Sequence, residues 1–168
     1  EIIKRTNAIF DRNPDPTTPR GSYVGVRNYT NLTWCVTPYL NAAVLAKDEY
    51  RINYSLRYLC DGFMYNTTGH NLDYPHGGIY EDGSVIFHDT VPYNMGYGSG
   101  HIENIAGLLL LTQNTALDIK NVPYYENIYD ILEKSFLPFI EENKKMKAVS
   151  GRWDPIDANG LMVAMMII

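Results

Sequence analysis

The sequence lacks most of the signals of a metal, phosphate-binding or membrane-spanning function. Its 168 residues contain only two cysteines, Cys35 and Cys60, and neither stands at a spacing typical of metal ligands. Two reduced cysteines in helices are favoured over a disulfide, although the sequence is compatible with both. The chain also has no glycine-rich phosphate-binding signature, no serine nucleophile elbow and no apolar run long enough to cross a membrane.

Positive charge is also in short supply. The formal net charge is −5, which disfavours a nucleic-acid partner and means that a polyanionic substrate would need a local basic patch. With 45% hydrophobic and 20% charged residues, the composition is typical of a globular domain. Because the sequence begins with charged residues and stops within the apolar run Met162 to Ile168, we expect residues 1–168 to be one helical domain of a longer chain.

Helical periodicity dominates what is present. It predicts helices over residues 1–11, 32–47, 49–65, 101–115 and 124–142, and from residue 156 or 157 to the end. Pro123 suits a helix start, and Pro138 should kink or end the helix that follows. A single short strand is predicted from Ser84 to Phe87. Consecutive antiparallel helices with long loops predict a mainly α fold, either a helical bundle or an α/α toroid.

The loop between residues 66 and 99 contains the most informative pair of residues. His88 and Tyr97 stand nine positions apart in a turn-rich stretch. Histidine is suited to taking a proton near neutral pH, and a tyrosine phenol can give one up if its pKa is lowered. Each residue alone is more often structural than catalytic, since the chain has 14 tyrosines, but the pair suggests an acid–base site. The lysines at 144, 145 and 147 are by default a solvated face.

A family resemblance strengthens that hypothesis. The segment EDGSVIFHDT, residues 81–90, followed by YNMGYG, residues 93–98, resembles the active-site loop of polysaccharide lyase family 8, which includes hyaluronate, chondroitin AC and xanthan lyases. Three further segments resemble family elements in the same order: Thr30-Asn31-Leu32, Ser135-Phe136-Leu137-Pro138-Phe139 and Ser150-Gly151-Arg152. The resemblance covers roughly residues 25–160 and implies part of an incomplete α/α toroid with long active-site loops.

The resemblance also implies a role for each matching residue. Asn31 would bind the uronate carboxylate, His88 would remove the C5 proton, and Tyr97 would protonate the departing glycosidic oxygen. Arg152 would stabilise negative charge and help tune the tyrosine. The division of proton transfers between His88 and Tyr97 stays open. The scheme requires no metal or organic cofactor. Hydrogen bonds from Asn31 and the positive charge of Arg152 would stabilise the negative charge that develops on the enolate, which lowers the barrier to elimination.

These roles imply a lyase that cleaves uronate-containing glycosaminoglycans of the chondroitin or hyaluronan type by β-elimination. The expected partners are the acidic polysaccharide and the remaining domains of the full-length chain, including the β-sandwich domains of the family. The expected location is extracellular, or at a cell surface or envelope. Four Asn-x-Ser/Thr sites, at Asn28, Asn31, Asn53 and Asn66, give weak support to a secretory route.

The sequence also departs from the family pattern. Many members carry a second arginine where this chain has Ile156, and the family's upstream aromatic sugar-binding element has no match. The Asn- and Tyr-rich composition is similar to that of the baculovirus envelope chondroitin lyases. Two alternatives therefore remain: a non-catalytic carbohydrate-binding or viral envelope module with a degenerate site, and an α/α-toroid hydrolase that uses carboxylates.

Overall fold

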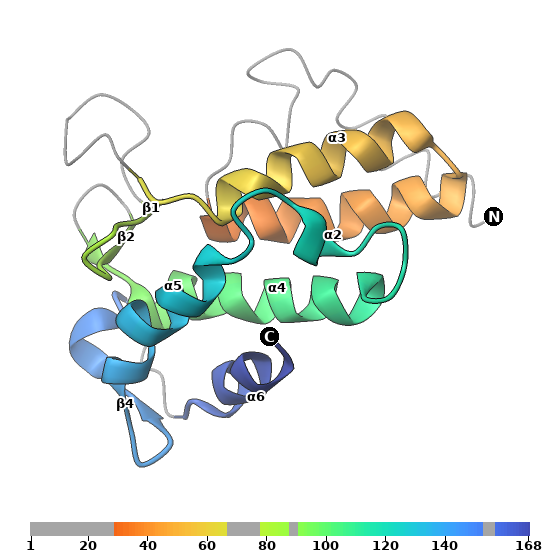
Figure 1. Ribbon diagram of the computed structural model, residues 1–168. Coiled ribbons are helices and arrows are strands. Elements are labelled where there is room, and N and C mark those ends of the chain that lie inside the picture. Colours follow the sequence, from red (N-terminus) through yellow and green to blue (C-terminus); the bar gives the residue numbers. More distant parts are fainter. Residues whose placement is uncertain (1–28, 67–77, 88–90, 153–156) are drawn as a thin grey trace.

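In the computed structural model of the protein, the residues described are 29–66, 78–87, 91–152 and 157–168. The helix expected over residues 1–11, His88 and Ile156 lie outside these ranges. The α-helices are α2 (Tyr29–Ala46), α3 (Glu49–Leu59), α4 (Ser99–Thr112), α5 (Asn127–Ser135) and α6 (Asn159–Ile167). Within the described residues the fold is mainly helical, as predicted (Figure 1).

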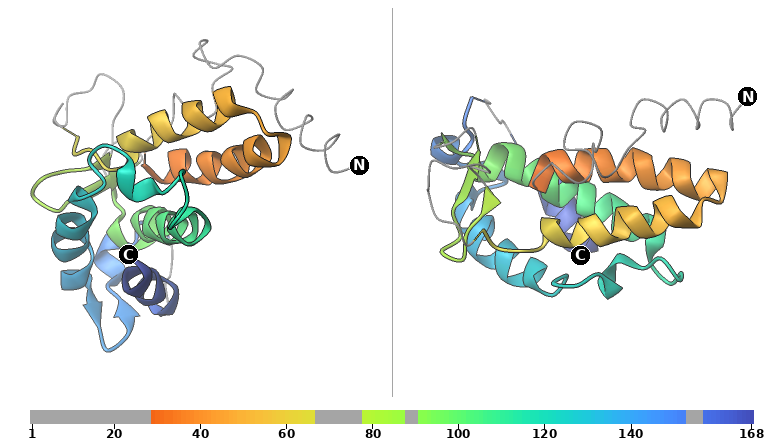
Figure 2. Two further views of the ribbon diagram at one scale, coloured as in Figure 1. Left: turned by 45° about the vertical axis from the view of Figure 1, so that its right-hand side comes forward. Right: turned by 90° about the horizontal axis from the view of Figure 1, so that it is seen from above.

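Helix α4 lies at the centre of the helical packing. The hairpin of α2 and α3 packs on one side of it and α6 on another, and the views agree on this arrangement (Figures 1 and 2). The apolar residues that meet between these helices are buried: Leu32, Val36, Leu40, Ile102, Ile105, Leu109 and Leu161. Removing such side chains from water is the main force that holds the helices together.

The sharp turn between α2 and α3 follows from local capping. Lys47 adopts a left-handed φ of 54°, and the backbone N–H of Asp48 donates to the Ala43 carbonyl at 2.9 Å, which closes the end of α2. The Asp48 carboxylate then accepts from the backbone N–H of Arg51 at 3.1 Å and caps α3. The predicted helices of this region are confirmed, although α3 is shorter than expected and passes into a 3-10 turn at Cys60–Gly62.

The helix predicted over residues 124–142 is shorter at both ends, although the predicted interruption at Pro138 is confirmed. Tyr124 has a left-handed φ of 67°, so Pro123 does not start the helix, and α5 begins only at Asn127. It ends at Ser135, because Pro138 lacks an N–H and would clash with the preceding helical turn. The chain continues as the 3-10 turn Leu137–Phe139 and a hairpin of β4 (Ile140–Glu141) and β5 (Lys144–Lys145).

The segment before α4 contains more strand than the sequence analysis predicted. The strand expected at residues 84–87 is confirmed as β2 (Val85–Phe87), but it lies between β1 (Gly78–Ile79) and β3 (Val91–Pro92) in an antiparallel sheet. The flanking strands have two residues each, too few to show an alternating pattern. This sheet lies near the start of α4 (Figure 1).

Helix α5 is joined to the segment that follows α3 by polar contacts, one of them from Asn127 Nδ2 to the Phe63 carbonyl at 3.0 Å. The Tyr65 phenol donates to the Asp130 carboxylate, whose Oδ2 also lies 2.9 Å from Lys134 Nζ. Burial and the bond to Asp130 raise the pKa of Tyr65, while the Tyr65 phenol and the Lys134 ammonium lower the pKa of Asp130. Asp130 is therefore held as a carboxylate at neutral pH.

Cys35 and Cys60 are separate thiols and form no disulfide with each other, as favoured from the sequence. Both are half-buried rather than fully buried in the core. None of the described helices is long and apolar enough to span a bilayer.

Candidate functional site

Tyr97 lies in a π-helical turn, Asn94–Gly98, that leads directly into α4. Single π turns are rare and occur frequently at functional sites. Its half-buried ring is surrounded by other aromatic rings, with centroid distances of 5.0 Å to Tyr93, 5.1 Å to Phe87 and 5.5 Å to Trp34. The phenol is therefore carried on a packed ring whose direction is fixed by its neighbours.

Arg152 reaches the Tyr97 phenol from a distant part of the chain. Its Nη2 donates to Tyr97 Oη at 3.3 Å, and its backbone N–H donates to the Tyr93 hydroxyl at 3.1 Å. The preceding Gly151 has a left-handed φ of 61°, which turns the chain so that both contacts form. A guanidinium is always protonated, so this contact supplies a fixed positive charge at the phenol oxygen.

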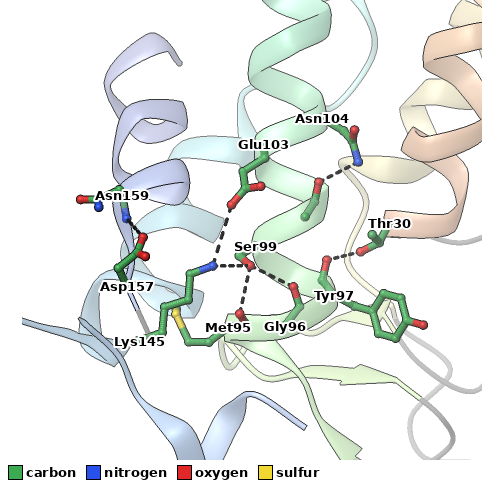
Figure 3. Close-up of polar contacts among 11 residues, drawn as sticks. Thr30, Met95, Gly96, Tyr97, Ser99, Glu103, Asn104, Lys145, Asp157 and Asn159 are labelled. Atoms are coloured by element: carbon green, nitrogen blue, oxygen red, sulfur yellow. Dashed lines mark hydrogen bonds and ion pairs between the residues drawn. The ribbon is translucent and has the colours of Figure 1, made fainter. Parts of the chain in front are cut away.

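Asn31 lies in the first turn of α2, close to the same tyrosine. The hydroxyl of its neighbour Thr30 donates to the Tyr97 carbonyl (Figure 3), and Trp34, one helical turn further on, contacts the Tyr97 ring. Residues three apart on a helix share a face, so the half-buried Asn31 lies on the face of α2 that carries Trp34. The structure therefore brings the α2 start, Tyr97 and Arg152 together at one end of the helices.

His88, the fourth predicted site residue, lies outside the described residues. The residue before it, Phe87, ends β2 and packs its ring against Tyr97. The predicted roles of Asn31, His88, Tyr97 and Arg152 remain predictions.

Other residues of the recognised motif hold the loop in place. Asp82 Oδ1 accepts from the Ser84 backbone N–H at 2.9 Å, which shapes the β1–β2 turn. The buried Asn94 amide donates to the carbonyls of Gly83 at 3.0 Å and Ser135 at 2.8 Å. Gly83 has a φ of 87° and no room for a Cβ, which would lie 2.8 Å from the Lys134 carbonyl oxygen. These residues support the site by fixing the backbone around it.

Lys145, which the sequence analysis did not single out, supports the π-helical turn Asn94–Gly98, called here the tyrosine turn, through Ser99 at the start of α4. Its Nζ donates to Ser99 Oγ at 3.1 Å and lies 3.9 Å from Glu103 Oε1 (Figure 3). Ser99 Oγ also lies 2.9 Å from the Gly96 carbonyl oxygen, within the turn that carries Tyr97. The expectation of a solvated face is wrong here, since only 13% of the Lys145 side chain is exposed. Lys144 and Lys147 are exposed. Successive side chains of a strand point to opposite faces, so the strand β5 is the signal that could have distinguished the exposed Lys144 from the partly buried Lys145.

Trp34 lies at a helical spacing typical of an apolar, buried face, yet 47% of its surface is exposed. The histidine of α4, His101, has the opposite character. It is buried, with Nε2 donating to the Gly62 carbonyl at 2.8 Å and Nδ1 3.4 Å from the Thr33 hydroxyl, so its role is structural.

Among the residues that the structure describes, no group of three His, Cys, Asp or Glu side chains could hold a metal ion.

Comparison with known proteins identifies the family. The profile described as "Polysaccharide lyase family 8, N terminal alpha-helical domain" matches residues 1–153. The chain belongs to polysaccharide lyase family 8. This family member is 28% identical over 159 residues to the hyaluronate lyase HylB of Enterococcus faecalis, covering 88% of this chain and 15% of that protein. It is 35% identical over 75 residues to a hyaluronate lyase of Thermasporomyces composti, covering 45% and 10% of the two chains.

Solved structures confirm the fold of this family member. The Streptomyces coelicolor A3 chondroitin AC lyase in complex with chondroitin sulphate superposes with a TM-score of 0.80 at 21% identity, covering 99% of this chain and 23% of that chain. A Paenibacillus xanthan lyase gives a TM-score of 0.65 at 25% identity, covering 89% and 13%. The predicted membership of an α/α-toroid family is confirmed. The chain spans less than a quarter of the length of each of these relatives.

Proposed function

We propose that the protein carrying this domain is a lyase that cleaves uronate-containing polysaccharides, of the chondroitin or hyaluronan type, by β-elimination. The observation that carries the proposal is the contact of Arg152 Nη2 with Tyr97 Oη at 3.3 Å, in a chain of polysaccharide lyase family 8. Family membership supports the reaction class, and the contact supports the choice of Tyr97 as the group that exchanges a proton at the cleaved bond.

The proposed mechanism begins with the substrate carboxylate. Removal of the C5 proton generates an enolate with two negative charges, which is the main obstacle to the reaction. Asn31 donates hydrogen bonds to the carboxylate and disperses that charge. His88 accepts the C5 proton, and the electron pair of the broken C–H bond forms the double bond as the C4–O bond breaks.

The leaving oxygen takes its proton from the Tyr97 phenol in this scheme. The resulting phenolate is stabilised by the charge of Arg152, which the structure places at the phenol oxygen. Proton exchange with water or with His88 then restores the phenol. The products are a new chain end and an unsaturated uronate, and atoms and charges balance without any added oxidant or reductant.

The test uses the full-length protein and its point variants on chondroitin and hyaluronan. Elimination creates a conjugated alkene, so ultraviolet absorbance of the product should rise for the parent protein. Tyr97→Phe should lower kcat by at least about a hundredfold, as expected for loss of a general acid–base group. Arg152→Met should lower kcat with less effect on the fold, because Arg152 is exposed.

Two results would separate the alternatives. Product ends that are saturated would indicate a hydrolase and contradict the elimination. Binding without cleavage, unaffected by His88→Ala, would indicate a carbohydrate-binding or envelope module. Since glycosaminoglycans are extracellular polymers, we also propose that the protein acts outside the cell or at a surface or envelope.

A further inference from the structure

Trp34 is a large aromatic side chain that is left half exposed beside the tyrosine. It lies on α2, its ring meets that of Tyr97 edge-on at 5.5 Å and 61°, and 47% of its surface remains open to solvent. Tryptophan is usually largely buried in single-domain proteins, because its apolar surface is the largest of any residue. Its exposure at this position therefore needs an explanation.

The indole is held in place without being covered. A Cβ added at Gly100 would lie 3.7 Å from Trp34 Cζ2 and 4.0 Å from Nε1, which are ordinary contact distances. The indole thus lies beside the first turn of α4, at a separation that a methyl group on Gly100 would just fill, and Tyr97 contacts the ring edge-on. An aromatic ring fixed by its edges costs little conformational entropy when a ligand covers its exposed surface.

Its position relative to the other site residues limits what that ligand can be. Asn31 and Trp34 lie one helical turn apart on the same face, and Tyr97 contacts Trp34 directly. A sugar whose carboxylate binds Asn31 and whose leaving oxygen meets Tyr97 would have its own ring or the adjoining sugar ring beside the indole. Pyranose rings carry apolar C–H faces that suit an aromatic surface.

We propose that Trp34 is a sugar-stacking platform that binds a pyranose ring of the uronate polymer at the Tyr97 site. This inference rests on the proposed function for the identity of the polymer. It also addresses a difficulty, since the chain has a net charge of −5 and long-range electrostatics oppose a polyanion. Apolar stacking supplies binding free energy that does not depend on charge, and Arg152 supplies local positive charge.

The test measures binding separately from cleavage. A Tyr97→Phe background keeps the ring that supports Trp34 and removes the phenol, so an oligosaccharide of chondroitin or hyaluronan stays intact during calorimetric titration. In that background Trp34→Ala should raise Kd about three- to tenfold, the range expected for one aromatic contact. Trp34→Phe should restore much of the affinity, because it keeps a smaller aromatic face.

A matched control comes from another exposed aromatic residue. Tyr129 on α5 is 53% exposed, and Tyr129→Ala should change Kd by less than about twofold. A spectroscopic signal is also available, because the chain has only two tryptophans. In a Trp153→Phe variant of the 168-residue chain, the remaining indole emission of Trp34 should shift as the oligosaccharide is added.

The outcomes distinguish a platform from a packing partner. If Trp34→Ala lowers kcat in the active protein while Kd in the inactive background is unchanged, Trp34 only supports Tyr97 and the inference is wrong. If the parent binds the oligosaccharide but yields no unsaturated product, the lyase proposal fails, and the Kd of Trp34→Ala still decides the platform. If the parent binds no uronate oligosaccharide, both proposals are overturned.

Discussion

Gly151→Ala offers the sharpest test of how Arg152 is delivered to Tyr97. Gly151 has a φ of +61°, and a Cβ at this position would lie 2.1 Å from Cε2 and Cζ of the Tyr93 ring. Adopting a left-handed backbone costs an alanine roughly 1–2 kcal/mol. Relieving the clash costs about 1–3 kcal/mol more, as in an overpacked core, because the Tyr93 ring is buried and cannot swing away.

We therefore expect Gly151→Ala to lower the free energy of unfolding by about 2–5 kcal/mol. The exposed loop can relieve part of the clash by moving outward, which accounts for the lower end of that range. Such a movement would break the bond from the Arg152 backbone to the Tyr93 hydroxyl and draw the guanidinium from Tyr97. Urea unfolding followed by circular dichroism gives the free energy, and product absorbance gives the activity of the full-length variant.

Gly107→Ala is the matched control. Gly107 lies within α4 and an added Cβ would meet nothing within 4 Å, so alanine should stabilise the helix by about 0.5–1 kcal/mol. The opposite signs of the two glycine substitutions separate the effect of position from that of residue type. A Gly151→Ala variant with parental stability would refute the argument that this left-handed turn against Tyr93 holds the Arg152 loop.

Two further substitutions test contacts on either side of the site. Lys145→Met keeps the side-chain stem but removes the charged donor to Ser99, and should lower the free energy of unfolding in urea by about 1–2 kcal/mol. Lys144 lies on the same strand but is exposed, so the control Lys144→Met should lower it by less than about 0.5 kcal/mol. Equal effects of the two substitutions would contradict a supporting role for Lys145. Asp130→Asn should destabilise at neutral pH, because the bond from Tyr65 lowers the pKa of Asp130 in the folded state. A lowered folded pKa contributes stability above the ordinary carboxyl value of about 3.9 and loses it as pH falls through the folded value, so the difference from the parent should vanish in acid; a difference that does not change with pH would be contrary evidence.

The helices that were predicted well from the sequence are those in which buried apolar residues recur at helical spacing. In α2 and α4, buried residues recur at helical spacing from Leu32 to Leu40 and from Ile102 to Leu109, so periodicity alone located them. The predicted start of α5 failed because it depends on a single backbone conformation, the left-handed Tyr124, which the apolar pattern does not reveal. The interruption at Pro138 could be predicted, because it follows from the residue type itself and not from the apolar pattern, which continues past it.

Hydrophobic periodicity also could not predict the two-residue strands or the charged side chain that turns toward the core. Strands of two residues contain no full alternation, so β1, β3, β4 and β5 left no pattern. The hairpin turns at Glu142 and Asn143, with φ values of 47° and 65°. This turn sets which of the two lysines of β5 faces α4 and is partly buried there. Trp34 fits an apolar helical face, and only the surrounding structure shows that nothing in the described residues covers it fully.

The meeting of Tyr97 and Arg152 spans 55 residues and could be anticipated only from the resemblance, because no local pattern links them. The structure shows why it is nonetheless well defined. One segment of the chain contacts the tyrosine turn twice, first through Lys145 on Ser99 and then through Arg152 on the phenol. Both contacts depend on backbone that departs from regular structure, the π turn before α4 and the left-handed Gly151. Departures from local preference are expected where function requires a fixed geometry, and here they coincide with the two groups proposed to carry and stabilise the transferred proton.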